Sequence, residues 1–171
     1  MIHLMIPTPA MEQEAMAFKQ AFYNAGERVI CGSYKLDNEH YSYADWLAIL
    51  ESNRSPETAD PKFGVSDTFF ARNEEEKLVG IINVRYELTP FYQNSGHIGY
   101  SVVPDQRGKG YAAQMLLAVL EKARENGLPE VKLVCKAKNN ASKKTMQKAG
   151  AALFRVFGEG DDQKEEYRII L

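Results

Sequence analysis

Apolar and polar residues alternate along the chain in a pattern that predicts strands and helices over its whole length. Apolar side chains three or four positions apart predict helices at 9–23, 42–50 and 111–123. Apolar runs of strand length, bounded by polar turns, predict strands at 2–6, 67–72, 78–86, 97–103, 131–136, 152–157 and 166–171. With a short polar helix after Asn139, the predicted order is β, α, α, β, β, β, α, β, α, β, β.

Polar residues mark where several of these helices begin. Thr8 is expected to cap the first helix, and Ser42 opens the second within a sequence that resembles a capping box. Asn139 is expected to cap the short polar helix. A helix separates the strands at 97–103 and 131–136, which favours a parallel pairing between them.

Composition and charge limit the classes of protein to consider. A chain of 171 residues without a linker or repeat is expected to form one domain over 1–171. The formal net charge is −2, so neither nucleic acid nor a membrane is expected as a partner. Cys31 and Cys135 are too few for a disulfide framework. No segment resembles a leader or spans a bilayer, which predicts a cytoplasmic protein.

The segment 102–112 carries the most specific chemistry. Gly108 and Gly110 allow a tight turn just before a predicted helix. The first amides of that helix have no partner within it, and the helix dipole favours an anion there. Arg107 and Lys109 add positive charge beside them. The sequence therefore predicts that this loop binds the phosphates of a cofactor.

Two common phosphate-binding motifs do not fit this loop. The dinucleotide fingerprint would place its third glycine at Ala113 and requires a later acidic residue after a strand, which is missing. The nucleotide P-loop does not occur in the chain. Arg107-x-x-Gly110-x-Ala112 instead resembles the [QR]xxGx[GA] pyrophosphate loop of the GNAT superfamily of acyl-CoA N-acyltransferases. A plain strand-to-helix turn is the alternative interpretation.

A second motif follows the next predicted strand. In the GNAT pattern this strand is followed by NxxS, a short helix, KxG and usually Phe. Asn139, Ser142, Lys148 and Gly150 match, whereas Ala151 stands in place of the Phe. Because both motifs occur in the expected order, residues 97–151 resemble the superfamily strongly.

The resemblance implies a fold and a cofactor. The fold would be α/β (α+β), with a mixed, mostly antiparallel sheet of about six to seven strands and helices on both faces. Acetyl-CoA would be the co-substrate, its pantetheine arm pairing with the strand edge at 100–103, and no metal is expected. The cofactor-binding residues carried over are Val102, Val103, Arg107, Gly108, Lys109, Gly110, Tyr111, Ala112, Asn139 and Ser142.

Acetyl transfer to an amine requires a group that removes a proton from the ammonium. His97 opens the cofactor strand and is expected to be this general base, since an ordinary histidine pKa of about 6.5 suits the task. Tyr86 and Glu87 are alternatives, and His97 could instead pin the turn at Gly96. A backbone amide near Val102 would stabilise the oxyanion.

The general acid departs from the family pattern. Many GNAT enzymes have a tyrosine two residues before the KxG lysine, but this chain has Met146, which cannot donate a proton. An alkyl thiol has a pKa of about 8.5, so the thiolate can leave without a strong acid. Tyr100, Cys135 and water remain candidates. The tyrosines Tyr86, Tyr92 and Tyr100, with Phe91, either line an acceptor pocket or pack the core and loops.

The resemblance implies an N-acetyltransferase that acts by direct attack in a ternary complex. Its acceptor would be the primary amine of a small molecule or a peptide. Met146 motivates the alternative of a non-catalytic CoA-binding sensor or partner-binding module. A phosphate-binding domain unrelated to CoA is a third interpretation. A homodimer stays open, because the sequence points to no particular surface.

Overall fold

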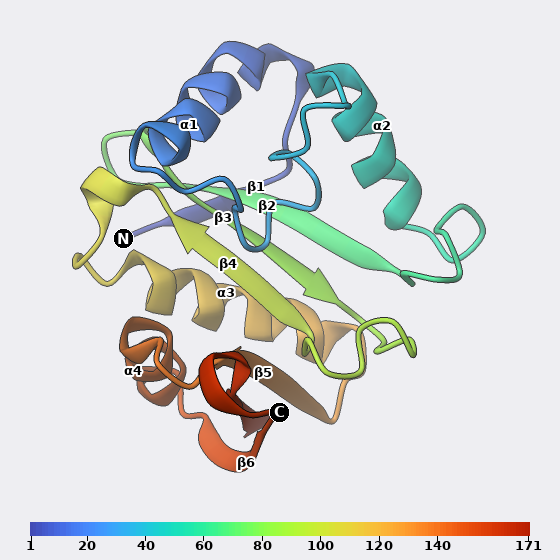
Figure 1. The fold of residues 1–171 in the computed structure, drawn as a ribbon. Helices are drawn as coiled ribbons and strands as arrows, with labels where there is room; N and C mark the ends of the chain where they lie inside the picture. Colours follow the sequence, from blue (N-terminus) through green and yellow to red (C-terminus); the bar gives the residue numbers. More distant parts are fainter.

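The computed structural model describes residues 1–171 and contains seven strands in two antiparallel sheets (Figure 1). The first sheet has the order β1 (His3–Met5), β2 (Ser66–Arg72), β3 (Leu78–Arg85), β4 (Ile98–Val102). The second has the order β5 (Glu130–Lys136), β7 (Lys164–Ile170), β6 (Ala152–Phe157). The helices are α1 (Glu12–Asn24), α2 (Tyr43–Asn53), α3 (Tyr111–Glu125) and α4 (Asn140–Lys148). The mixed α/β class and the number of strands are confirmed.

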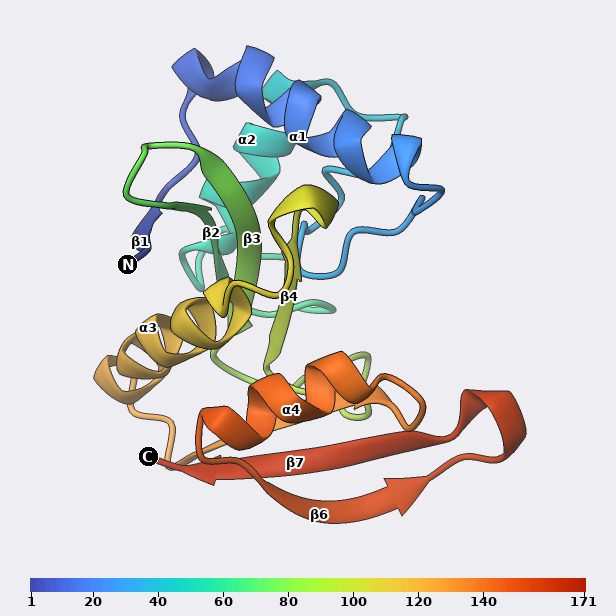
Figure 2. The same cartoon turned by 90° about the vertical axis from the view of Figure 1, so that its left-hand side faces the viewer.

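The first sheet is buried on both faces, with α1 and α2 on one side and α3 on the other (Figure 2). Because successive side chains of a strand point to opposite faces, Ile81 packs with Phe18 and Trp46, while Ile82 packs with Met115. This double burial explains why β3 is apolar along nearly its whole length. Each such side chain contributes about 1.5–3 kcal/mol of hydrophobic stabilisation.

The second sheet packs against α3 and α4 and shares a core with the first. Leu133 of β5 and Tyr167 of β7 belong to the same cluster as Met115 of α3. Met146 of α4 is 1% exposed within this cluster. The residue that stands in place of the family's tyrosine is therefore a core side chain.

The two sheets meet only where β4 begins. The parallel pairing predicted for β4 and β5 is wrong: they lie in different sheets, joined by an isolated antiparallel bridge between Gly96 and Leu133. Gly96 has a φ of +77°, and a Cβ there would lie 2.6 Å from the carbonyl oxygen of Lys132. Only glycine fits this close approach. Beyond the bridge, one edge of β4 pairs with no strand.

The predicted helix starts are confirmed at two of three positions. Ser42 and Asp45 form a complete capping box at α2, and the Oδ1 atom of Asn139 accepts the N–H of Ser142 at 3.1 Å. Thr8 makes no side-chain cap. The chain passes first through a short 3₁₀ turn, Pro9–Met11, so that α1 begins three residues later than predicted. The other two 3₁₀ turns are Pro104–Gln106 and Gly160–Asp162.

Candidate active site

A groove of about 500 Å³ lies between β4 and α4 and reaches the N-terminus of α3. Three parts of the chain line it: the loop after α1, the segment from β4 into α3, and α4. Its lining residues are Glu27, Val29, Cys31, Tyr100, Ser101, Val102, Gln106, Arg107, Gly108, Gly110, Tyr111, Ala112, Ala113, Asn139, Ala141, Thr145 and Lys148.

The glycine loop presents backbone amides to this groove. Gly108 and Gly110 have φ angles of +79° and +81° with open space around them, so the backbone conformation rather than close packing requires glycine. No side chain caps α3, whose first turn is closed by the N–H of Gln114 on the carbonyl of Gly110 at 3.2 Å. The amides at 111–113 therefore lack partners within the helix and can bind an anion.

The unpaired edge of β4 presents a second set of amides. On the paired edge, Val103 donates its N–H to the carbonyl of Val79, and the carbonyl of His97 accepts the N–H of Arg85. Since the hydrogen-bonding groups of a strand alternate between its two edges, Tyr100 and Val102 direct theirs to the open edge. This edge borders the groove, and unpaired strand edges can pair with an extended chain that carries amide groups.

The positive charge of Arg107 is partly neutralised within the chain. Its two terminal nitrogens donate to the Glu27 carboxylate at 2.7 and 2.8 Å, and its Nε donates to the carbonyl of Val102 at 3.0 Å. Hydrogen bonding to Arg107 lowers the pKa of Glu27. Lys109 lies outside the groove lining, and its ammonium donates to Gln106 at 2.8 Å. The free amides, rather than these side chains, are the more open anion donors.

The remaining predicted cofactor residues separate into two groups. Those that line the groove are Val102, Gly108, Gly110, Tyr111, Ala112 and Asn139. Val103 is buried in the core beneath α1 and α2. The Oγ atom of Ser142 lies 2.9 Å from the Tyr100 hydroxyl, so Ser142 supports a lining residue and does not line the groove itself.

Tyr100 projects from β4 into the groove lining. Burial raises its pKa to about 12, although the hydrogen bond with Ser142 acts in the opposite direction. The hydroxyl is therefore protonated at neutral pH and can donate a proton or a hydrogen bond.

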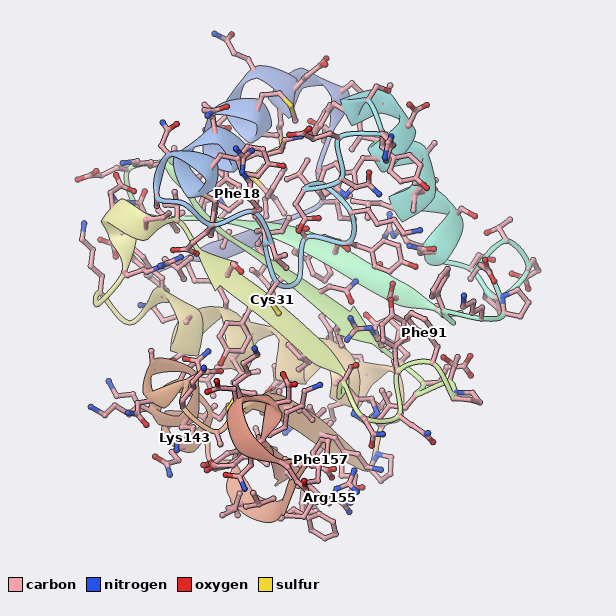
Figure 3. All side chains as sticks on the ribbon, in the orientation of Figure 1. Phe18, Cys31, Phe91, Lys143, Arg155 and Phe157 are labelled. Atoms are coloured by element: carbon pink, nitrogen blue, oxygen red, sulfur yellow. The ribbon has the colours of Figure 1, made fainter.

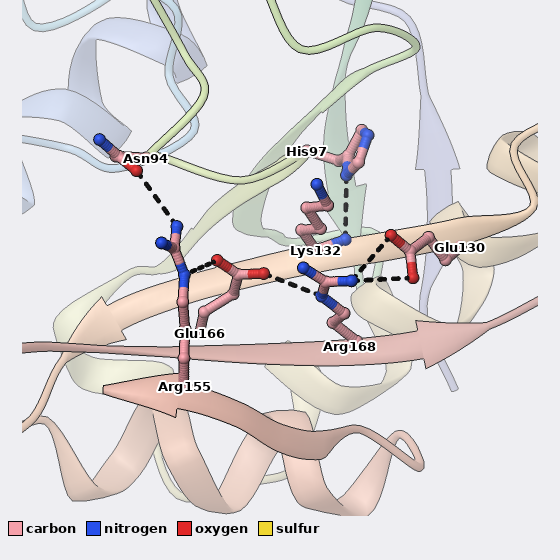
Figure 4. Close-up of polar contacts among 7 residues, drawn as sticks. All are labelled: Asn94, His97, Glu130, Lys132, Arg155, Glu166 and Arg168. Carbon is pink, nitrogen blue, oxygen red and sulfur yellow. Dashed lines mark hydrogen bonds and ion pairs between the residues drawn. The ribbon is translucent and has the colours of Figure 1, made fainter. Parts of the chain in front are cut away.

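His97 has a different environment from the one expected of a general base. Its Nδ1 atom accepts the backbone N–H of Lys132 at 2.9 Å (Figure 4), which leaves the proton of the neutral ring on Nε2. The side chain is buried outside the groove lining, and burial is the main cause that lowers its pKa to about 4. With its lone pair in use and its basicity reduced, the geometry argues against the base role predicted for His97.

The other acid–base candidates also lie outside the groove lining. Tyr86 donates to the Asp67 carboxylate at 2.6 Å, and burial followed by this hydrogen bond raises its pKa. Glu87 is exposed just after β3. Cys135 is buried in β5, and burial raises the pKa of its thiol.

No sequence motif indicates the wall formed by the loop after α1. Cys31 lines the groove, and its carbonyl accepts the hydroxyl of Ser101 at 2.8 Å. Gly32 packs so closely on Gly99 of β4 that any Cβ would collide with the backbone. Burial raises the pKa of the Cys31 thiol. These contacts join residues about 70 positions apart, so no local motif contains them.

Comparison with known proteins places this fold in a family. The profile of the acetyltransferase (GNAT) domain matches residues 7–152. The structure resembles the microcin C7 self-immunity acetyltransferase MccE, solved with acetyl-CoA and AMP, with a TM-score of 0.70 and 16% identity over 99% of this chain and 92% of the other. A GNAT-family acetyltransferase from Streptococcus pneumoniae matches with a TM-score of 0.70 and 16% identity, over 100% of this chain and 99% of the other. Aminoglycoside acetyltransferase AAC(6')-Ib, solved with coenzyme A, matches with a TM-score of 0.67 and 12% identity, over 99% of this chain and 95% of the other.

The chain belongs to the GNAT acetyltransferase family, because the family profile covers most of its length. It is an acetyl-CoA-dependent acyltransferase. A search of curated protein sequences finds no match. None of the helices is long and apolar enough to cross a membrane, and no group of three or more His, Cys, Asp or Glu side chains is arranged to hold a metal ion.

Proposed function

We propose that the groove binds acetyl-CoA and that the enzyme transfers its acetyl group to the primary amine of a small molecule or peptide. One observation carries this proposal: the uncapped N-terminus of α3 and the unpaired edge of β4 border the same groove. The amides at 111–113 suit a pyrophosphate. The open edge at Tyr100 and Val102 suits the amide-containing pantetheine arm.

In the transfer, one covalent bond to the acetyl carbon forms and another breaks. The neutral amine nitrogen attacks the acetyl carbon, so a C–N bond forms and the C–S bond to coenzyme A breaks. The amide that Val102 directs to the open edge is the donor for the negative charge on the carbonyl oxygen. The amine passes its proton to water, and the hydroxyl of Tyr100 supplies the proton that the leaving thiolate gains.

Thermal unfolding with coenzyme A, followed by thiol release from acetyl-CoA, tests the proposal. Ligand at 100 times its Kd stabilises a protein by about 2.7 kcal/mol, which is an easily measured shift. We expect a shift with both ligands and thiol release with at least one amine among amino acids, polyamines, aminoglycosides and peptides.

The outcomes separate the competing functions. A shift without turnover on any amine would indicate a non-catalytic CoA-binding module. No shift would mean that the groove does not bind coenzyme A. Met146 is buried and does not line the groove, so the proposal assigns the proton donor to Tyr100 instead of that position.

A further inference from the structure

Three cationic side chains converge on a group of aromatic rings beside β3. The ammonium of Lys35 lies 5.0 Å from the centre of the Phe63 ring, and that of Lys62 lies 4.9 Å from the centre of Phe91. The Phe63 and Phe91 rings are 5.1 Å apart. We call this group the Arg85 cluster; its members are Lys35, Lys62, Phe63, Arg85, Phe91 and Tyr92.

Arg85 joins this cluster through Tyr92. Its guanidinium carbon lies 3.9 Å from the centre of the Tyr92 ring, and its Nη1 donates to the carbonyl of Gly96 at 3.0 Å. Its Nε is shielded from solvent and has no hydrogen-bond partner. No carboxylate of the chain forms an ion pair with Arg85, Lys35 or Lys62.

An unpaired, partly buried cation is costly unless a ligand supplies the opposite charge. Asp60 contacts Lys62, but its carboxylate accepts the backbone N–H of that residue and not its ammonium. The backbone at Lys35 has a φ of +75°, a strained conformation for a residue other than glycine, and such strain is concentrated at functional sites. Charge, burial and backbone together indicate a place for an anionic group.

The Arg85 cluster lies near the junction of the two sheets, outside the residues that line the groove. Arg85 bonds to Gly96, the residue that bridges to β5. Its charge also opposes the effect of burial on the pKa of Cys31, which lines the groove. Figure 3 shows Cys31 in front of β4 and Phe91 in the loop that joins β3 to β4. The amides of α3, proposed for the pyrophosphate, lie beyond the opposite end of β4.

We propose that the Arg85 cluster binds a carboxylate carried by the acceptor, so that the substrates are small amino carboxylates rather than polyamines. This inference rests on the proposed acetyl transfer. The guanidinium supplies positive charge and the N–H donors that its bond to Gly96 leaves free, and its stacking on Tyr92 holds the plane of the group. Lys35 and Lys62 add positive charge over the neighbouring Phe63 and Phe91 rings.

Matched acceptors test the proposal directly. Each amino acid is compared with its own carboxamide, at saturating acetyl-CoA, by the rate of thiol release. We expect kcat/KM to be at least tenfold higher for the carboxylate. The amine of the carboxamide loses its proton more readily, so this preference cannot arise from amine basicity.

Substitutions locate the preference. Arg85→Met is expected to lower kcat/KM for the carboxylate by about 10–100-fold, the range expected for a charge-assisted contact, and to leave the carboxamide within about twofold. Lys35→Met should also lower kcat/KM for the carboxylate, by a smaller factor. This variant tests the proposal if Arg85→Met does not fold. Lys19→Met is the matched control, because Lys19 lies over Tyr23, outside the cluster.

Several results would overturn the inference. Equal kcat/KM for carboxylate and carboxamide would do so. An equal loss of kcat/KM on both substrates in Arg85→Met would also do so, provided that coenzyme A still raises the melting temperature of that variant. Turnover of polyamines alone would overturn this inference and leave the proposed acetyl transfer standing. Absence of turnover with every amine would reject both.

Discussion

Lys132 donates its backbone N–H to Nδ1 of His97 at 2.9 Å, and His97 donates its own backbone N–H to the carbonyl of Lys132 at 2.8 Å. This reciprocal pair joins the two sheets next to the bridge between Gly96 and Leu133. A neutral imidazole is required, because protonated Nδ1 could not accept the bond. The histidine thus helps to join the two sheets at the point beyond which one edge of β4 is unpaired.

The stability of the protein should therefore fall in mild acid. The pKa of His97 is lowered from 6.5 to about 4 in the folded state, so between these values the unfolded state binds more protons. The free energy of unfolding should decrease by up to about 1.4 kcal/mol per pH unit as the pH falls through this window. Urea unfolding at pH 7, 6, 5 and 4 measures the slope.

A His97→Asn variant separates this effect from the titration of other groups. It should be less stable at pH 7 and show a flatter slope between pH 6.5 and 4, whereas His40→Asn on the surface should keep the native slope. The pH profile of kcat should keep its shape in His97→Asn. Loss of one limb of that profile would restore His97 as the base.

Gly110→Trp should abolish the binding of coenzyme A. The new side chain would enter the groove at the start of α3, and the φ of +81° would add strain. Gly127→Trp is the matched control, since Gly127 has a φ of +77°, equally open surroundings and a position outside the groove. Calorimetric titration with coenzyme A measures both. Native-like binding in Gly110→Trp would refute the assignment of the glycine loop.

Glu27→Gln should strengthen the binding of coenzyme A by about 3–10-fold. Removing the carboxylate takes a negative charge out of the groove and releases Arg107 toward the phosphates. The cost in stability should stay below about 1 kcal/mol, because the ion pair is partly exposed. The same titration checks this, with Glu121→Gln as control, since Glu121 pairs with Arg124 away from the groove. Weaker binding would show that Glu27 itself contacts the ligand.

Tyr100→Phe should lower kcat by about 10–100-fold and leave the affinity for coenzyme A within about threefold. The hydroxyl is the proton donor proposed for the leaving thiolate, and a thiol needs less help than a stronger base would. Thiol release at pH 7–9 measures the change, and the deficit should shrink as the pH rises. Ser142→Ala, which removes only the partner of that hydroxyl, should have a smaller effect. An unchanged kcat in Tyr100→Phe would assign this proton to water.

Local patterns predicted the elements and the glycine loop well. The capping box at Ser42 and the cap at Asn139 depend on neighbours three residues away, so the sequence contains each motif whole. The groove could not be predicted in the same way. The pairing of Glu27 with Arg107 spans 80 positions, and the contact that engages His97 spans 35. Such partners are chosen by the packing of sheets and loops, which local spacing does not encode.

The pairing of β4 and β5 shows the same limit. The helix between them favoured a parallel pair, because that rule describes strands within one sheet. Here α3 lies between two sheets and contributes Met115, Leu116 and Val119 to a core that both share. Burial of α3 from two sides therefore separates the strands that it connects.

A substitution at Gly96 should affect both proposed binding sites, although this residue belongs to neither. The main-chain links between the sheets are confined to residues 96–97 and 132–133, so the unpaired edge of β4 and the Arg85 cluster both adjoin this one attachment. A methyl group at Gly96 would press on the carbonyl of Lys132 and spread the two sheets at that point. Gly96→Ala should therefore weaken the binding of coenzyme A and of the acceptor carboxylate together, although Gly96 contacts neither ligand. This glycine would then control the geometry of both binding sites.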